Sequence, residues 1–352
     1  MKRIVLCACV VTALAACGDP TKPAEPSPTR PTAAAVAQRF TIQDLGTLGG
    51  TFSQGNAINE VGEVAGVADL PSGEARAMLW RAGQGMQSLG TLGGANSRAR
   101  GINDRSEVAG VSETAEGTEE AFLWSESSGM RSLGTLGGDN SAANAINNRG
   151  EVVGFSETRK GETQAVLWRP GRRLQALGTL GGPESRARGI NDATQVVGFS
   201  QTADGNDHAF LWTAARGMED LGTLGGPTSA AFGISETGEV VGTSETAGGN
   251  QEAFLWTREG GMRSLGTFAG DPSTLANSVN THRSVVGHSV TAADEIGLPF
   301  LWTPERGIQR LRTLGGDQGQ PNDLNESGQI GGTSVTAQGA TRAALWIPAA
   351  TP

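Results

Sequence analysis

The sequence predicts an all-β fold, a seven-bladed β-propeller built from four-stranded antiparallel blades. Evenly spaced tryptophans, four short β-favouring runs in each repeat, and an offset between the two ends of the repeat array lead to this fold. The tryptophans recur every 44 residues, apart from one step of 46. Such a period is typical of propellers. The repeat positions are Trp80, Trp124, Trp168, Trp212, Trp256, Trp302 and Trp346.

The third copy shows what one repeat contains. Two β-favouring runs within residues 141–156 flank a turn, in which Asn147 can cap the backbone and Gly150 can adopt a positive φ. Further runs occupy residues 164–168 and 173–177, and no stretch is long enough or suitably periodic for a helix. Each copy therefore holds four strands, A to D, which favours a propeller over the alternative of a β-solenoid with shorter coils.

The ends of the array are out of phase with the repeat. The chain begins with a lone D run and stops just after the last C run. This offset predicts that residues 40–45 pair with the last C strand at residues 343–346 and close the ring. The D runs end at Leu45, Leu89, Leu133, Leu177, Leu221, Leu265 and Leu311.

Small residues recur on strands A and B. One face of strand A is small, as at Ser97, Ala99 and Gly101, which suits blades that converge on an axis. Strand B has a glycine in every copy, and glycine within a strand often allows a bulky group to approach. We therefore expect each tryptophan to pack over or near it. These glycines are Gly66, Gly110, Gly154, Gly198, Gly242, Gly287 and Gly332.

The first 16 residues resemble a bacterial lipoprotein signal peptide. Lys2 and Arg3 precede an apolar run at residues 4–13, which is too short to span a bilayer, and the segment ends Leu-Ala-Ala before Cys17. Cys17 is then lipidated and anchors the mature chain in a membrane. An ordinary secretory signal is the alternative. The remaining cysteines lie in the removed segment, so the sequence excludes disulfides and thiolate metal sites.

Residues 17–39 are expected to form a lipidated, proline-rich tether, residues 40–348 the propeller, and residues 349–352 a C-terminal tail. Gly18, rather than aspartate, after Cys17 favours the outer membrane of the cell envelope. A net charge of -9, with no run of lysine or arginine, argues against a nucleic-acid partner. We expect a monomer with a protein or glycan partner.

One copy carries a family signature. The segment at residues 208–212 reads His-Ala-Phe-Leu-Trp, and Leu-Gly-Thr-Leu-Gly-Gly follows at residues 221–226. The repeats at residues 40–346 resemble the HAF repeat, a probable extracellular repeat of bacteria. The resemblance implies an exported protein with no established catalytic activity. His208 is replaced in the other copies, so it is not a repeated metal ligand.

Candidate binding residues are those at which the copies differ, because the identical positions explain the scaffold. Where other copies have asparagine, the face of strand A opposite the small residues carries arginine pairs in two copies and phenylalanine in another. These side chains should lie near the axis, where paired arginines suit a carboxylate or phosphate ligand. The alternative is that they pair with Asp139, Glu184, Asp271 or Asp317. The candidates are Arg98, Arg100, Arg186, Arg188 and Phe232.

The remaining motifs assign no catalytic residue, metal ligand or cofactor. The B-to-C loops are acidic and the C-to-D loops carry arginines such as Arg81 and Arg169, so the two faces could dock oppositely charged partners. The alternative, which we favour, is ordinary solvated loop charge. Residues 204–207 have a calcium-like composition but fit a hairpin turn better. The sequence therefore favours a non-catalytic binding or scaffolding module of the cell envelope. The alternative is a hydrolase or lyase acting on envelope polysaccharide through an axial pocket.

Deleting residues 40–45 is expected to destabilise the whole fold, because the deletion exposes the edge of the last C strand and opens the ring. Urea unfolding of the truncated chain measures the loss. Deleting six residues of the tether is the control and should leave the unfolding midpoint unchanged. Equal midpoints for the two deletions would contradict ring closure.

Overall fold

The computed structural model describes residues 40–268, 271–290 and 297–349. The predicted signal peptide, the lipidation site Cys17 and the tether lie outside these residues. The regular structure within them consists of 28 β-strands. No helix in the described ranges is long and apolar enough to cross a membrane.

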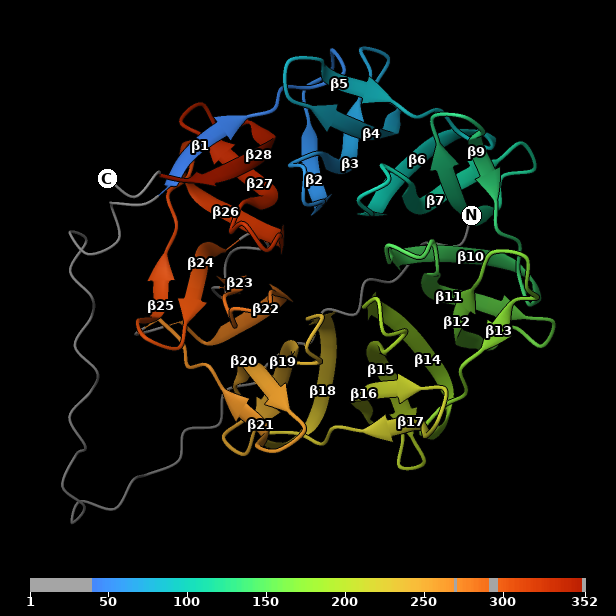
Figure 1. The fold of residues 1–352 in the computed structure, drawn as a ribbon, viewed down its shortest axis with the longest axis vertical. Coiled ribbons are helices and arrows are strands. Elements are labelled where there is room, and N and C mark those ends of the chain that lie inside the picture. Colours follow the sequence, from blue (N-terminus) through green and yellow to red (C-terminus); the bar gives the residue numbers. More distant parts are fainter. Residues whose placement is uncertain (1–39, 269–270, 291–296, 350–352) are drawn as a thin grey trace. The chain divides into compact units, whose positions relative to one another are not determined.

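The strands form antiparallel sheets in chain order. We call β2–β5 unit 1, β6–β9 unit 2, β10–β13 unit 3, β14–β17 unit 4, β18–β21 unit 5, β22–β25 unit 6, and β26–β28 with β1 unit 7. Units 5 and 6 are joined into one larger sheet by a single parallel bridge between Gln251 and Ser273. Figure 1 shows the units arranged around a common centre, with the first strand of each nearest to it.

The bounds of the strands repeat closely from unit to unit. The first strands are β2 (Ser53–Ile58), β6 (Gly93–Ile102), β10 (Gly137–Ile146), β14 (Gly181–Ile190), β18 (Gly225–Ile234), β22 (Ser273–Val279) and β26 (Gly315–Leu324). The second strands are β3 (Val64–Asp69), β7 (Val108–Thr114), β11 (Val152–Thr158), β15 (Val196–Thr202), β19 (Val240–Thr246), β23 (Val285–Val290) and β27 (Ile330–Thr336).

The outer half of each unit is shorter and ends at the rim. The third strands are β4 (Ala75–Arg81), β8 (Glu119–Ser125), β12 (Thr163–Trp168), β16 (Asp207–Thr213), β20 (Gln251–Thr257), β24 (Leu298–Thr303) and β28 (Thr341–Pro348). The fourth strands are β5 (Gly85–Ser88), β9 (Gly129–Ser132), β13 (Gln175–Ala176), β17 (Gly217–Asp220), β21 (Gly261–Ser264), β25 (Gly307–Arg310) and, from the other end of the chain, β1 (Phe40–Asp44).

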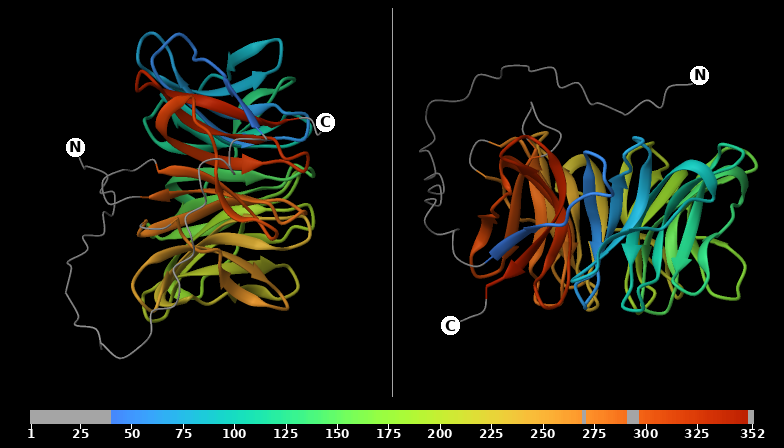
Figure 2. Two further views of the ribbon diagram at one scale, coloured as in Figure 1. Left: turned by 90° about the vertical axis from the view of Figure 1, so that its left-hand side faces the viewer. Right: turned by 90° about the horizontal axis from the view of Figure 1, so that it is seen from above.

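The predicted pairing of the N-terminal strand is present. Strand β1 runs antiparallel to β28, with Phe40 opposite Pro348 and Asp44 opposite Ala344. The Leu45 N–H extends the ladder by donating to the Ala343 carbonyl at 3.0 Å. Figure 2 shows β1 lying against the strands of unit 7. The first and last segments of the repeat array thus share one sheet.

The A-to-B turn has the predicted chemistry. The Asn147 side-chain oxygen accepts the N–H groups of Arg149 and Glu151 at 3.0 and 2.9 Å. Gly150 has φ +75°, a value that glycine adopts without steric cost. In the other units an asparagine or, in unit 5, Ser235 accepts the N–H four residues later. The positive φ is held by glycine or, in three units, by Ser106, Thr194 and Arg283.

Side chains at these turns also join neighbouring units. The Asn103 amide donates to the Asn147 carbonyl of the next unit at 3.1 Å, and Asn325 of unit 7 donates to the Asn59 carbonyl of unit 1 at 3.1 Å. Ser235 holds this position in unit 5, and its hydroxyl donates within its own turn to Glu239. The donors of the inter-unit bonds are Asn59, Asn103, Asn147, Asn191, Asn280 and Asn325.

The hydrophobic core lies between units as well as within them. In one cluster Leu79 and Leu89 of unit 1 pack with Val108, Phe122 and Trp124 of unit 2. All seven tryptophans are buried in this way, with at most 9% of their surface exposed. Burial of an aromatic side chain at each boundary contributes strongly to stability.

The expected packing of tryptophan over the strand-B glycine is wrong in most units. Gly110 lies opposite Phe122, whereas Trp124 lies opposite Val108. The close approach comes instead from strand A, because a Cβ added to Gly110 would lie 2.0 Å from the Arg98 carbonyl oxygen. A tryptophan approaches closely at Gly332, where Trp346 Cζ3 would lie 3.0 Å from the added Cβ.

A β-bulge in strand A explains the glycine. In unit 2 the register shifts between Ala99 and Gly101, which leaves Arg100 as the extra residue. Equivalent shifts occur in the first strand of every unit. Bulges bend a strand and change the direction of side chains. Here the bend presses the strand-A carbonyl against strand B, where only glycine fits.

Ser235→Asn is expected to stabilise the fold by about 1 kcal/mol, because the new amide can donate to the Asn280 carbonyl while its oxygen caps the turn. Urea unfolding measures the change. The reverse substitution, Asn103→Ser, is the matched control and should destabilise by a similar amount. An unchanged urea midpoint for Ser235→Asn beside a lowered one for Asn103→Ser would contradict this explanation of the unit 5–6 boundary.

Candidate functional site

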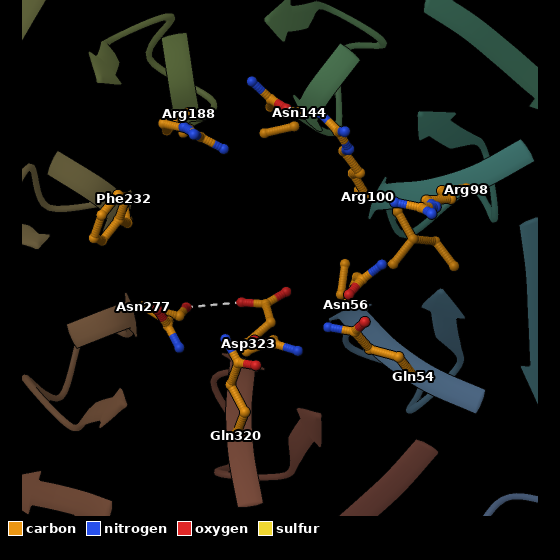
Figure 3. Close-up of a pocket in the computed structure, with 18 of the residues that line it drawn as sticks. Gln54, Asn56, Arg98, Arg100, Asn144, Arg188, Phe232, Asn277, Gln320 and Asp323 are labelled. Carbon is orange, nitrogen blue, oxygen red and sulfur yellow. Dashed lines mark hydrogen bonds between the residues drawn. The ribbon is translucent and has the colours of Figure 1, made fainter. Parts of the chain in front are cut away.

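A cavity of about 880 Å³ lies at the centre of the units. This volume is in the range of small-molecule binding sites. Its walls come mainly from the first strands of different units, and the bulged residues line it (Figure 3). These residues are Asn56, Arg100, Asn144, Arg188, Phe232, Asn277 and Asn322.

The asparagines at the bulge hold neighbouring units together. The Asn56 amide donates to the Ala99 carbonyl at 2.7 Å, and the Asn144 amide donates to the Ala187 carbonyl at 2.7 Å. Asn277 and Asn322 do the same toward the units that follow them. Asparagine at this position is therefore part of the scaffold, and its replacement in three units marks where the pocket departs from it.

Three of the predicted arginines line the pocket. Arg100 donates to the Asn144 side-chain oxygen at 2.7 Å. The side chains of Arg98 and Arg188 make no hydrogen bond to any described residue, and the Arg188 Nε atom is buried without a partner. Phe232 lines the same cavity. The structure thus brings together four of the five residues selected from the sequence.

The arginines stay unpaired with carboxylates. None of the four predicted arginines forms an ion pair with a carboxylate within the described ranges. The alternative expectation, that they pair with the acids of the D-to-A loops, is therefore not met there. Burial, together with the charges of Arg100 and Arg186, lowers the pKa of Arg188 to about 10. Burial also lowers the pKa of Arg100. A bound anion would offset both the desolvation and the mutual repulsion.

Arg186 does not line the pocket. Its guanidinium lies 4.5 Å from the centre of the Phe155 ring, on the second strand of the preceding unit. This cation–π contact occupies the side chain between two units. The prediction that Arg186 faces the axis is therefore wrong, because an aromatic partner on the neighbouring unit holds it away.

Asp323 is a pocket residue that the sequence analysis missed. Its carboxylate accepts the Ser278 hydroxyl at 2.7 Å and the Ile58 N–H at 3.1 Å, so it connects units 6, 7 and 1. Burial raises the pKa of Asp323 to about 6 against the effect of these hydrogen bonds. A signal was available, because the equivalent positions of five other copies hold alanine or glycine.

His288 also lines the pocket and was not selected. It is buried, and its Nδ1 lies 3.4 Å from the Asn277 amide nitrogen. Burial lowers the pKa of His288 to about 4, so the ring is neutral at pH 7. No group of three or more His, Cys, Asp or Glu side chains able to hold a metal ion occurs in the described part of the chain.

Solved structures with similar folds support the architecture. TolB from Acinetobacter baumannii aligns with a TM-score of 0.51 and 15% identity over 71% of this chain and 65% of TolB. A puromycin hydrolase S511A mutant aligns with a TM-score of 0.54 and 15% identity over 85% of this chain and 55% of the hydrolase. The fold is a β-propeller. At this identity the likeness shows the fold alone. No protein-family model and no curated protein matches this sequence.

A second, smaller cavity of about 330 Å³ opens near the A-to-B turns. Isoleucines such as Ile102 and Ile146 line both cavities and lie between them. Each acid in its wall except Asp323 accepts a backbone N–H from the preceding unit, as Asp104 does from Glu60 at 2.9 Å. These acids are Glu60, Asp104, Asp192, Glu236 and Glu326.

The expected basic end is therefore partly neutralised. Arg81 pairs with Glu63 at 2.7 Å and Arg169 pairs with Glu151 at 3.2 Å, which places the C-to-D turns beside the A-to-B turns. The acidic cavity lies at the same end. The arginines of the C-to-D turns thus lie among carboxylates of the A-to-B turns, and this end is not uniformly basic. Residues 204–207 form the expected hairpin turn, with Gly205 at φ +85°.

Asp323→Asn is expected to remove a pH dependence of stability between pH 6 and 4. The pKa of Asp323 is about 6 in the fold, above about 3.9 for an unfolded aspartate, so its contribution to stability rises as the pH falls through this window. The variant resembles the protonated side chain. Its stability relative to the unsubstituted chain should fall by roughly 1–3 kcal/mol from pH 7 to 4.

Urea unfolding at several pH values measures this difference. Asp204→Asn, on an exposed turn, is the control for a general change of charge. A difference between Asp323→Asn and the unsubstituted chain that stays constant with pH would contradict the prediction.

Proposed function

We propose that this chain is an exported envelope lipoprotein of the HAF-repeat type, anchored through Cys17, whose propeller binds a small organic anion in the axial pocket. The propeller has seven blades and is closed by β1. Closure is supported by the sheet shared by β1 and β28 and by the hydrogen bonds from Asn322 and Asn325 of unit 7 to unit 1. The protein acts by binding rather than by catalysis.

One observation carries the binding role. Arg98, Arg100 and Arg188 reach a common cavity without a carboxylate partner in the described residues. Two of these cations, Arg100 and Arg188, are partly buried. Desolvation without an opposite charge costs stability, so such an arrangement is retained where a ligand supplies that charge. Guanidinium groups bind carboxylate and phosphate through paired hydrogen bonds. The ligand class that fits is a carboxylate or phosphate small enough for the cavity.

The surface favours a small ligand over a protein partner. Among the described residues Val61 is the exposed large hydrophobic side chain. A protein-binding face usually presents a contiguous apolar patch. The Asp323 carboxylate, which an enzyme would need as acid, base or nucleophile, is already engaged by Ser278 and by backbone N–H groups. The pocket is therefore better suited to holding an anion than to transforming it.

Arg188→Gln is expected to weaken binding of cyclohexanecarboxylate and phenyl phosphate by about 10- to 100-fold, the effect of losing a charged hydrogen bond. Isothermal titration calorimetry on the full mature chain measures the affinities. The variant should remain folded, because Arg188 forms no ion pair or hydrogen bond within the described residues and its guanidinium lies 5.6 Å from the centre of the Phe199 ring, its one aromatic contact.

Arg173→Gln makes the same change of charge at an exposed turn and should bind like the unsubstituted chain. Equal affinities for Arg188→Gln and Arg173→Gln would overturn the proposed function. So would a failure of the unsubstituted chain to bind any carboxylate or phosphate tested, with or without hydroxyl groups.

A further inference from the structure

We infer that the anion bound in the axial pocket is polyhydroxylated, a sugar acid or a sugar phosphate. This inference rests on the proposed function and adds the chemistry of the wall that faces the arginines. Figure 3 shows Arg98, Arg100 and Arg188 on one side of the cavity and Asn277, Gln320 and Gln54 on the other, with Phe232 between them.

The far wall presents hydrogen-bond acceptors. The Asn277 and Asn322 amide nitrogens donate to backbone carbonyls at 2.8 and 2.7 Å, and Asn56 donates to Ala99. Since the nitrogen of each amide is committed to the scaffold, its oxygen remains the group available to a ligand in the cavity that these residues line. No described residue donates to these three oxygens. The wall therefore offers acceptors at fixed positions, which suit ligand O–H groups.

Two glutamines add groups of both kinds. Gln54 and Gln320 line the cavity and precede Asn56 and Asn322 by two residues on the same strands. The side chains of the two glutamines make no hydrogen bond to any described residue. A primary amide offers two donors and one acceptor. A hydroxyl is likewise both donor and acceptor, so adjacent sugar hydroxyls match this wall better than a second anion or an apolar ring does.

Phe232 accounts for the shape of the ligand. In the described residues neither an aromatic ring nor a cation stacks on it, although other phenylalanines of the chain have such partners. Phe232 stands where other units have the asparagine that donates to the next unit. Unit 5 therefore lacks this inter-unit hydrogen bond and has an apolar ring in a polar cavity instead. A pyranose ring has apolar C–H faces and polar edges, and this wall suits such a ring.

The proposal separates three matched probes. D-Glucuronate carries both a carboxylate and hydroxyls, cyclohexanecarboxylate carries only the carboxylate, and D-glucose carries only the hydroxyls. Calorimetry on the full mature chain is expected to show glucuronate binding at least about 10-fold more tightly than either of the others. Glucose 1-phosphate is tested beside glucuronate to distinguish a sugar phosphate from a sugar acid as the ligand source.

Each outcome bears on one part of the argument. Tighter binding of glucuronate or of glucose 1-phosphate than of cyclohexanecarboxylate and glucose supports the inference. Whichever of the two sugar anions binds more tightly identifies the anionic group of the ligand. Cyclohexanecarboxylate binding as tightly as both sugar anions would overturn the inference but leave the proposed function intact. No binding of any anion, or equal binding of glucose and glucuronate, would overturn the proposed function itself.

Variants of the glutamines test the acceptor wall without removing a scaffold bond. Gln320→Leu and Gln54→Leu should each weaken binding of the preferred sugar anion by about 10-fold and leave cyclohexanecarboxylate unchanged. Gln43→Leu, on the exposed face of β1, is the matched control. Equal losses for the sugar anion and cyclohexanecarboxylate would show a general disturbance of the pocket and contradict the assigned role.

Discussion

The β-bulge in the first strand of each unit is the constraint on which the rest of the structure depends. At the bulge two residues oppose one on the second strand, so the strand bends toward it. The bend brings a carbonyl of the first strand close to the second strand, as the Arg98 carbonyl comes close to Gly110. The residue of the second strand at this point therefore has to be glycine. The extra residue is left unpaired and points to the axis. One backbone irregularity thus fixes the glycine and creates a side-chain position that is free to vary.

That free position serves either the scaffold or the pocket. Where it is asparagine, as at Asn56, the amide ties one unit to the next with a hydrogen bond that contributes about 1 kcal/mol. Arg188 and Phe232 make no such bond, and burial of Arg188 adds a desolvation cost. The pocket is therefore formed where inter-unit bonding is reduced. The turn asparagines and the buried tryptophans supply enough contact between units to tolerate this loss.

The sequence allowed the fold to be predicted because the period, the turn residues and the phase of the array are all properties of the repeat. The pairing of β1 with β28 followed from counting runs. The candidate arginines could be found because copies that differ stand out against copies that agree. The predictions that were wrong depended on the register of the strands, which the sequence does not give. The role of the strand-B glycine depends on a bulge that leaves no unambiguous sequence signal, and Arg186 lies off the axis because Phe155 of another unit binds it.

The two cavities give the axis a direction. Two acids of the smaller cavity, Glu60 and Glu236, have a raised pKa because burial and neighbouring carboxylates disfavour their charge. An anion approaching from that end meets this acidic ring and then the apolar isoleucines before it reaches the arginines. The other end of the larger cavity carries Arg98, which is exposed. At that end an anion meets an arginine before it reaches the isoleucines, although the acidic B-to-C loops lie at the same end. The two ends of the axis differ because the acids, the isoleucines and the arginines lie at successive positions along the first strands. A repeat of nearly identical units therefore still forms a site whose two ends are chemically distinct.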